Sequence, residues 1–142
     1  MRHLLSMVAI LMWVGTAEAA EQQTCTRDEA MQAEDEAVAL RDWTAVYRSF
    51  KRYAHCDDGA ISEGYSDSIA RLLTREWKRV GDLERLTASD KSFEQFILHH
   101  IDETDLPEEL KRISENARMR CPPKATRLCR LIAARVRELF SR

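Results

Sequence analysis

The chain has 142 residues, of which 44 % are hydrophobic and 32 % charged, and its formal net charge is −2 at pH 7. This length leaves no need for a second domain, and with only 4 glycines and 3 prolines the chain contains no low-complexity linker. So few helix-breaking residues favour helices throughout.

The first 19 residues have the pattern of a secretory signal peptide. Arg2 and His3 precede an apolar run over residues 4–14, and the small residues Ala17 and Ala19 flank Glu18. We expect cleavage after Ala19, followed by a single helical domain over residues 20–142. The apolar run is shorter than the roughly 20 residues of a spanning helix, so we expect a periplasmic or secreted protein without a membrane span in its mature chain.

The first two helices are predicted to form an antiparallel hairpin. Thr26 and Glu29 match a capping box that opens a helix ending near Leu40, and Asp42 caps a second helix. The inward positions of the second helix are Trp43, Val46, Tyr47, Phe50 and Ala54.

The stretch over residues 53–77 is predicted to supply the central helix, starting after Asp57 and Asp58 and running to about Val80, with Gly81 as its C-terminal cap. Gly64 inside it predicts the close approach of another helix. Its apolar stripe comprises Ile61, Tyr65, Ile69, Leu72, Leu73 and Trp77.

A brief helical segment starts at Asp82, and Ser89 or Asp90 caps the following helix. A further helix opens at Thr104 or Asp105, and Pro122 and Pro123 separate it from the last. The last three of these helices have the following inward residues. They are Phe93, Phe96, Ile97 and Ile101 in the helix capped by Ser89 or Asp90; Leu106, Leu110, Ile113 and Ala117 in the next; and Leu128, Leu131, Ile132, Val136, Leu139 and Phe140 in the last.

These elements predict an all-α fold, a compact bundle of about six helices built from antiparallel hairpins. A short right-handed stack of helix pairs is the alternative, although no sequence repeat supports it.

All four cysteines lie in the exported part of the chain, where an even number favours disulfides, and no CxxC pattern indicates a metal site. Cys25 and Cys56 stand at the open ends of the first hairpin, so we expect them to bond, which stabilises the fold by roughly 3–4 kcal/mol. The turn at Pro122 predicts the second pair, Cys121 with Cys129.

Two clusters contain residue types that could bind metal or transfer protons. The first comprises His55, Cys56, Asp57, Asp58, Glu63 and Asp67, and the second His99, His100, Asp102 and Glu103. A half-cystine, helix caps and a wet helix face explain the first cluster more simply. Adjacent helical residues diverge by about 100°, so His99 and His100 do not readily share an ion. His100 is expected in the core or at its boundary, with one hydrogen-bond partner.

Charge is divided unevenly along the chain. Residues 20–110 contain 11 Lys/Arg and 21 Asp/Glu, whereas residues 111–142 contain 10 Lys/Arg and 2 Asp/Glu. The basic side chains of this last segment include Arg118, Arg120, Lys124, Arg127, Arg130, Arg135 and Arg137. They either meet an anionic partner, with Arg127, Arg130 and Arg137 pointing outward, or neutralise the acidic first helices. Nucleic acid is not an expected partner, because export separates the chain from it and Phe140 is the single aromatic residue of the segment.

No HExxH, GxSxG, phosphate-binding loop or EF-hand pattern occurs, and we expect no cofactor. The sequence favours an exported, non-enzymatic binding or interaction protein of the bacterial envelope, of the inhibitor, immunity or assembly-factor type, with a protein or an anionic envelope component as its partner. The alternative is a small periplasmic hydrolase or metal-dependent enzyme. That alternative requires the weak candidates His55, Glu63, Asp67 and His99 to converge in one cleft.

Overall fold

The computed structural model describes residues 24–142, so the predicted signal peptide lies outside the described residues. The described part is 80 % helical, with seven α-helices and no strand, which confirms the all-α prediction. The α-helices are α1 (Arg27–Ala37), α2 (Trp43–Tyr53), α3 (Gly59–Arg75), α4 (Val80–Ser89), α5 (Lys91–His99), α6 (Pro107–Met119) and α7 (Thr126–Phe140). Three short 3₁₀ helices are η1 (Ala54–Cys56), η2 (Trp77–Arg79) and η3 (Pro123–Ala125).

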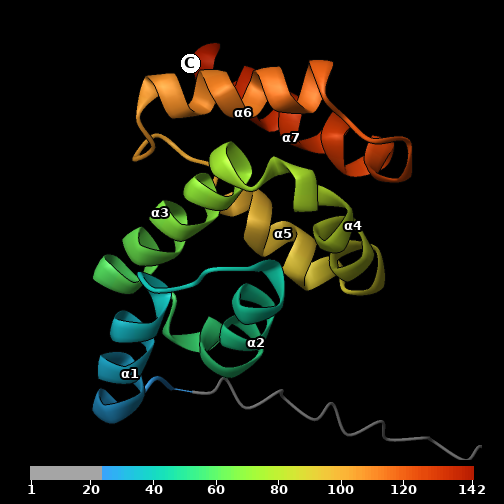
Figure 1. Ribbon diagram of the computed structural model, residues 1–142. Helices are drawn as coiled ribbons and strands as arrows, with labels where there is room; N and C mark the ends of the chain where they lie inside the picture. The colour runs from blue at the N-terminus through green and yellow to red at the C-terminus, as the bar shows by residue number, and fades with distance from the viewer. Residues whose placement is uncertain (1–23) are drawn as a thin grey trace, which may run out of the picture.

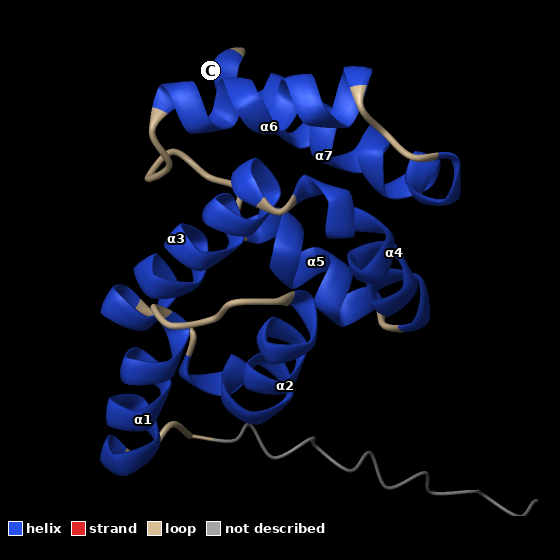
Figure 2. Ribbon diagram, in the orientation of Figure 1, coloured by secondary structure: helices blue, strands red, loops and turns tan. Residues whose placement is uncertain are grey.

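The helices lie in three tiers (Figure 1). α1 and α2 form one end of the molecule, α3, α4 and α5 form the middle, and α6 and α7 lie side by side across the other end. Figure 2 shows that short loops join them. Within residues 24–142, every helix is too short or too polar to cross a membrane.

The N-terminal hairpin, α1 and α2, begins as the capping residues predict. Thr26 Oγ1 accepts from the Glu29 N–H, Glu29 accepts from the Thr26 N–H at 3.0 Å, and Asp42 accepts from the Ala45 N–H at 2.8 Å. α1 nevertheless ends at Ala37, before the expected Leu40.

α3 is the central helix. It contributes more buried residues than any other described helix and packs against both α1 and α6. A Cβ at Gly64 would lie 3.0 Å from the side chains of Ala37 and Val38, which confirms the close helix approach.

The C-terminal boundary predicted for this helix was wrong. α3 ends at Arg75 instead of Val80, and Gly81 lies in the first turn of α4. The Thr74 hydroxyl bonds the carbonyls of Ala70 and Arg71, a local contact that competes with helix continuation, and the chain then turns so that the Trp77 indole N–H can reach the Arg120 carbonyl at 2.9 Å.

Both predicted disulfides, Cys25–Cys56 and Cys121–Cys129, are present. The predicted stripes form one continuous core, with Leu131 half-buried outside it and three exposed exceptions among the inward positions. Ala54 is exposed in η1, Leu106 precedes α6 as its N-cap, and Phe140 lies at the free end of α7. All three sit at helix termini, where a periodic pattern no longer determines which side faces the core.

Candidate functional site

The four weak enzyme candidates do not converge. His55 lies beside Glu29, Asp67 pairs with Arg71 at 2.8 Å, and Glu63 is exposed on α3, while His99 is exposed at the end of α5. In residues 24–142, the one group of three or more potential metal ligands is Glu29, His55 and Cys56, and Cys56 is oxidised. The cleft that the enzyme alternative requires is therefore not formed.

His100 instead joins a buried chain of hydrogen bonds. Its Nδ1 lies 3.0 Å from Ser66 Oγ, its Nε2 lies 3.0 Å from Asp57 Oδ2, and the Ser66 hydroxyl donates to Asp102 Oδ2 at 2.9 Å. The expectation of a single partner was wrong, because the ring has one partner on each nitrogen: the Ser66 hydroxyl from α3 and the Asp57 carboxylate from the loop before α3. Serine, histidine and aspartate in series are also the residue types of a hydrolase triad.

Burial argues against catalysis by this chain of residues. Ser66 is 2 % exposed and His100 0 % exposed, so a substrate cannot reach either of them. The Ser66 proton is already donated to Asp102. Burial raises the pKa of Asp102, but hydrogen bonds from Thr104 and Ser66 outweigh that effect and hold the pKa below its usual value. The network therefore fixes α3 to the loop between α5 and α6.

Asp105, in that same loop, has the opposite environment. Burial, together with the nearby charges of Asp102 and Glu109, raises the pKa of its carboxyl to about 7, although the Asp102 N–H donates to it at 3.2 Å. A group with this pKa makes the loop sensitive to pH but has no reacting partner within reach.

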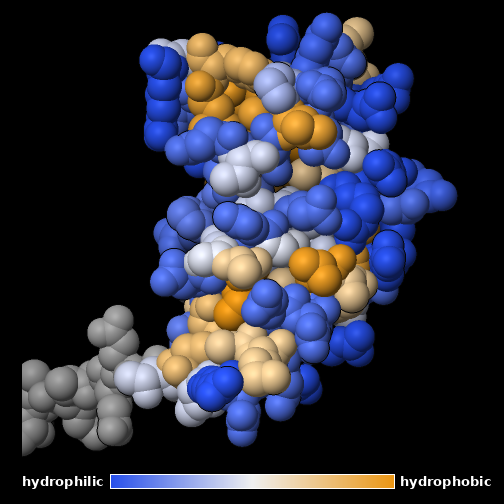
Figure 3. Space-filling view, turned by 90° about the vertical axis from the view of Figure 1, so that its left-hand side faces the viewer, coloured by the Kyte–Doolittle hydropathy of each residue, from blue (hydrophilic) through white to orange (hydrophobic). Residues whose placement is uncertain are grey.

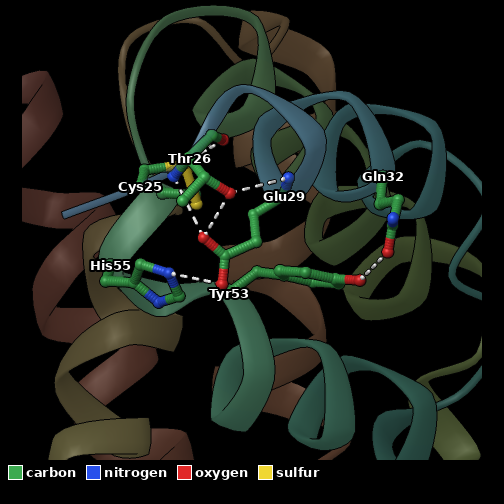
Figure 4. The surroundings of a disulfide bond; sticks show 7 residues. Cys25, Thr26, Glu29, Gln32, Tyr53 and His55 are labelled. Carbon is green, nitrogen blue, oxygen red and sulfur yellow. Dashed lines mark hydrogen bonds and ion pairs between the residues drawn. A yellow bond between two sulfur atoms is a disulfide. The ribbon is translucent and has the colours of Figure 1, made fainter. Parts of the chain in front are cut away.

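The corner around the Cys25–Cys56 disulfide is shown in Figure 4. Glu29 Oε2 accepts from both the N–H and the hydroxyl of Thr26, and Glu29 Oε1 lies 3.4 Å from His55 Nε2. The Thr26 N–H, followed by its hydroxyl, lowers the pKa of Glu29, so this carboxylate is ionised over the neutral range. The sequence places His55 in a metal-ligating cluster but does not indicate Glu29 as its neighbour. The available signal was that Glu29 follows Cys25 by four residues, which is about one helical turn.

A recess lies between α6 and α7. It has a volume of ≈ 650 Å³, with an apolar floor and arginines on its rim. Its lining residues are Ser114, Arg118, Arg130, Ala133, Ala134, Val136, Arg137 and Phe140, and we call it the hairpin groove. Phe140 is 61 % exposed, and Met119, beside an adjoining recess, is 82 % exposed. Figure 3 shows apolar side chains gathered at this end of the molecule between hydrophilic ones.

Five arginines of the C-terminal segment fall into two sets. Arg127 donates to Glu84 at 3.0 Å and also to Glu94, and Arg135 donates to the Ile101 carbonyl at 2.9 Å. Arg127 is therefore half-buried against α4 and α5, which corrects the expectation that it points outward. Its side chain fastens α7 to the middle tier.

Arg118, Arg130 and Arg137 form the second set. They are exposed, and no ion pair reaches them within residues 24–142. The ion pairs that the segment makes with other helices go to α4 and α5, whereas α1 lies at the opposite end of the molecule (Figure 1). Direct pairing with the acidic first helix therefore does not explain the basic segment.

Comparison with known proteins adds no relative: no family model, no curated protein and no solved structure matches this chain.

Proposed function

We propose that this chain is an exported, non-enzymatic binding protein of the bacterial envelope, and that its hairpin groove binds an acidic amphipathic segment of a partner protein. The observation that carries the proposal is the position of Arg118, Arg130 and Arg137, three arginines without an ion-pair partner in the described chain, around an apolar recess. Both disulfides fit export, because they form in oxidising compartments.

The chemistry of the rim favours carboxylates. Of the ten basic residues from Lys111 to Arg142, eight are arginines, whose planar guanidinium groups match carboxylates with two parallel hydrogen bonds. The apolar lining, with Val136 and Phe140, offers surface whose burial contributes about 25 cal/mol per Å². A helix with one acidic edge and one apolar edge satisfies both surfaces at once.

The shape of the site favours a protein over a lipid surface. The apolar residues Ala133, Ala134 and Val136 line a recess between two helices, and a flat bilayer would not fill such a recess. A helical segment laid along α6 and α7 would place its apolar side chains inside it.

Non-enzymatic function is supported by the same geometry. The serine and histidine of the buried network are inaccessible, and the recess itself is lined by arginine, alanine, valine, serine and phenylalanine, without a histidine or carboxylate to act as a base.

A synthetic peptide tests the proposal. A helical peptide with glutamates along one edge and leucines along the other should bind the oxidised protein, as measured by calorimetry. Its affinity should fall steeply as ionic strength rises through about 0.15 M, because exposed charges are then screened over about 8 Å. A peptide of the same composition with its leucines scattered around the helix is the matched ligand control.

Charge reversal locates the binding surface. Changing Arg118, Arg130 and Arg137 to Glu should abolish peptide binding without a loss of thermal stability. The control variant reverses three exposed arginines outside the groove, Arg41, Arg48 and Arg75, and should bind nearly as the wild type does. Arg127 is left unchanged because its reversal would remove the ion pairs that hold α7 against α4 and α5.

Three results would overturn the proposal. Equal binding by the groove variant and the wild type would place the surface elsewhere. Binding to phosphatidylglycerol vesicles, with none to either peptide, would make the partner a lipid. Failure to bind peptide or vesicles would also refute it.

A further inference from the structure

The disulfide corner of the N-terminal hairpin holds four groups that zinc prefers as ligands. Cys25 and Cys56 contribute two sulfurs, η1 contributes the His55 imidazole, and the first turn of α1 contributes the Glu29 carboxylate. Glu29, His55 and Cys56 can each place one ligand atom within 4.8 Å of the others, and Cys25 is bonded to Cys56. Figure 4 shows Cys25, His55 and Glu29 gathered around this corner.

Two of the ligands already have the separation that a zinc ion requires. His55 Nε2 and Glu29 Oε1 lie 3.4 Å apart. Nitrogen and oxygen ligands each bond zinc at about 2.0–2.1 Å, which puts two tetrahedral neighbours about 3.3–3.4 Å apart. The His55 nitrogen is buried and makes no hydrogen bond within the described chain, since Glu29 is close to it but poorly aligned.

The surroundings hold the carboxylate in place. Thr26 donates its N–H and its hydroxyl to Glu29 Oε2, which leaves Oε1 directed at His55. Hydrogen bonds of this kind orient metal ligands and maintain their charge. Cys25 is exposed and precedes α1, so its sulfur can move away from Cys56 once their bond is broken, while Cys56 is buried in η1.

We propose that reduction of the Cys25–Cys56 disulfide converts this corner into a zinc site with Cys25, Cys56, His55 and Glu29 as ligands. A dithiol reductant supplies two electrons and two protons: its own two sulfurs become a disulfide, and the Cys25–Cys56 bond becomes two thiols. Zinc then displaces both thiol protons to solvent and binds the two thiolates, the neutral imidazole and the carboxylate.

The site keeps the N-terminal hairpin closed in either redox state. The disulfide joins the ends of α1 and α2 covalently when oxidised, and zinc joins the same ends when reduced. The other cysteine pair lacks this property, because no histidine or carboxylate completes a ligand group with Cys121 or Cys129 in residues 24–142. The two pairs therefore differ chemically, and each serves as the control for the other.

Metal binding can be measured on the whole exported chain. The protein is reduced anaerobically with a water-soluble phosphine, which takes its oxygen atom from water and leaves no competing thiol. Dialysis against zinc should then yield one tightly held ion per chain, and the oxidised protein should yield none. Cobalt in place of zinc should give the visible spectrum of a tetrahedral site with thiolate ligands.

Alkylation identifies the cysteines without any substitution. In reduced wild-type protein, zinc should slow the modification of Cys25 and Cys56, as read by peptide mass spectrometry, and should leave Cys121 and Cys129 as reactive as before. Equal protection of both pairs, or protection of neither, would overturn the proposal.

Two variants test the remaining ligands. Glu29→Gln retains the capping hydrogen bonds, because glutamine also closes a capping box, but removes the anionic ligand. His55→Ala removes the imidazole. Both variants should keep the oxidised fold by circular dichroism and lose the tight zinc ion after reduction. Unchanged zinc stoichiometry and cobalt spectrum in both variants would show that the thiolates act alone, and would refute the four-ligand site.

Discussion

Each of the two helical hairpins of this molecule contains one disulfide. In the N-terminal hairpin it lies at the open ends of the helices, and in the C-terminal hairpin it lies at the turn. Cys25–Cys56 joins the open ends of α1 and α2 across a sequence separation of 31, whereas Cys121–Cys129 spans the turn between α6 and α7 across a separation of 8. The first bond joins the start of α1 to the end of α2, which the chain does not otherwise connect at that end of the hairpin. The second tightens a turn that the chain already makes, so the far ends of α6 and α7 are held by noncovalent contacts alone.

The two ends also present different surfaces, although the N-terminal hairpin has a recess of its own beside Glu36, Arg41 and Arg48. In the N-terminal hairpin, Tyr53 donates to Gln32 at 3.0 Å and the polar side chains near the disulfide are mutually engaged. In the C-terminal hairpin, an apolar recess between the helices is open and Phe140 is exposed beside it. A disulfide at a turn fixes two helices as neighbours without sealing the groove between them.

The largest expected effect comes from removing the support that both hairpins share. Leu72 is buried in α3, which contacts α1 and α6. Leu72→Ala should lower the free energy of unfolding by about 2–5 kcal/mol, through lost apolar burial and the cavity left behind. Denaturant unfolding measures the loss, with Glu63→Ala on the exposed face of α3 as control. A nearly unchanged midpoint would show that Leu72 is not part of a shared core.

Removal of each disulfide in turn compares the hairpins directly. On the chain-entropy model, Cys25→Ser with Cys56→Ser should cost roughly 4 kcal/mol, and Cys121→Ser with Cys129→Ser roughly 2–3 kcal/mol, because the longer loop constrains the unfolded chain more. Thermal or denaturant unfolding in the presence of a chelator gives both values. The reverse order would mean that the turn at Pro122 depends on its disulfide more than the open ends of α1 and α2 do.

The loop that leads into the C-terminal hairpin should respond to pH. The pKa of Asp105 is raised to about 7 in the folded state from its ordinary value of 3.8, so it contributes stability that is present below about pH 4 and is lost as pH rises through about 7. Asp105→Asn should therefore gain stability over the wild type at about pH 8, by roughly 1–3 kcal/mol, and the advantage should shrink toward pH 4. Unfolding curves across this range test it, and a pH-independent difference would contradict the assignment.

The smallest effects should separate the two sets of arginines. Arg127→Ala leaves Glu84 and Glu94 without their shared partner and should cost about 1–2 kcal/mol, whereas Arg130→Ala should change the stability by less than about 0.5 kcal/mol. Unfolding midpoints of the two variants decide the matter. Similar losses would show that α7 is not fastened through Arg127.

Local chemistry made the fold predictable. The capping pair of Thr26 and Glu29, the cap at Asp42 and the stripe along α3 each depend on residues close together in the sequence. The first hairpin brings Cys25 to Cys56, and the turn at Pro122 brings Cys121 to Cys129. The end of α3 was not predictable in the same way, because the contact of Trp77 with Arg120 joins residues 43 apart in the sequence.

The candidate sites were predictable only in part. Periodicity identifies the side of α7 that faces the core, but Arg127 lies at the border of that face, and its partners Glu84 and Glu94 come from two other helices. Ser66 precedes Leu73 by seven residues and therefore shares its buried face, which was a signal that a polar side chain there needs a partner. The identity of that partner, His100, depends on how α5 packs.

The Trp77 contact also gives the molecule a built-in optical reporter. The described residues hold two tryptophans: Trp43, buried in the N-terminal hairpin, and Trp77, whose indole donates to a backbone carbonyl of the segment that links α6 to α7. Separation of the C-terminal hairpin from the rest of the molecule would break that bond and expose the Trp77 indole to water, while the Trp43 indole would stay buried. Intrinsic fluorescence of Trp43→Phe and Trp77→Phe variants would then follow the two ends of the protein separately, without an attached label.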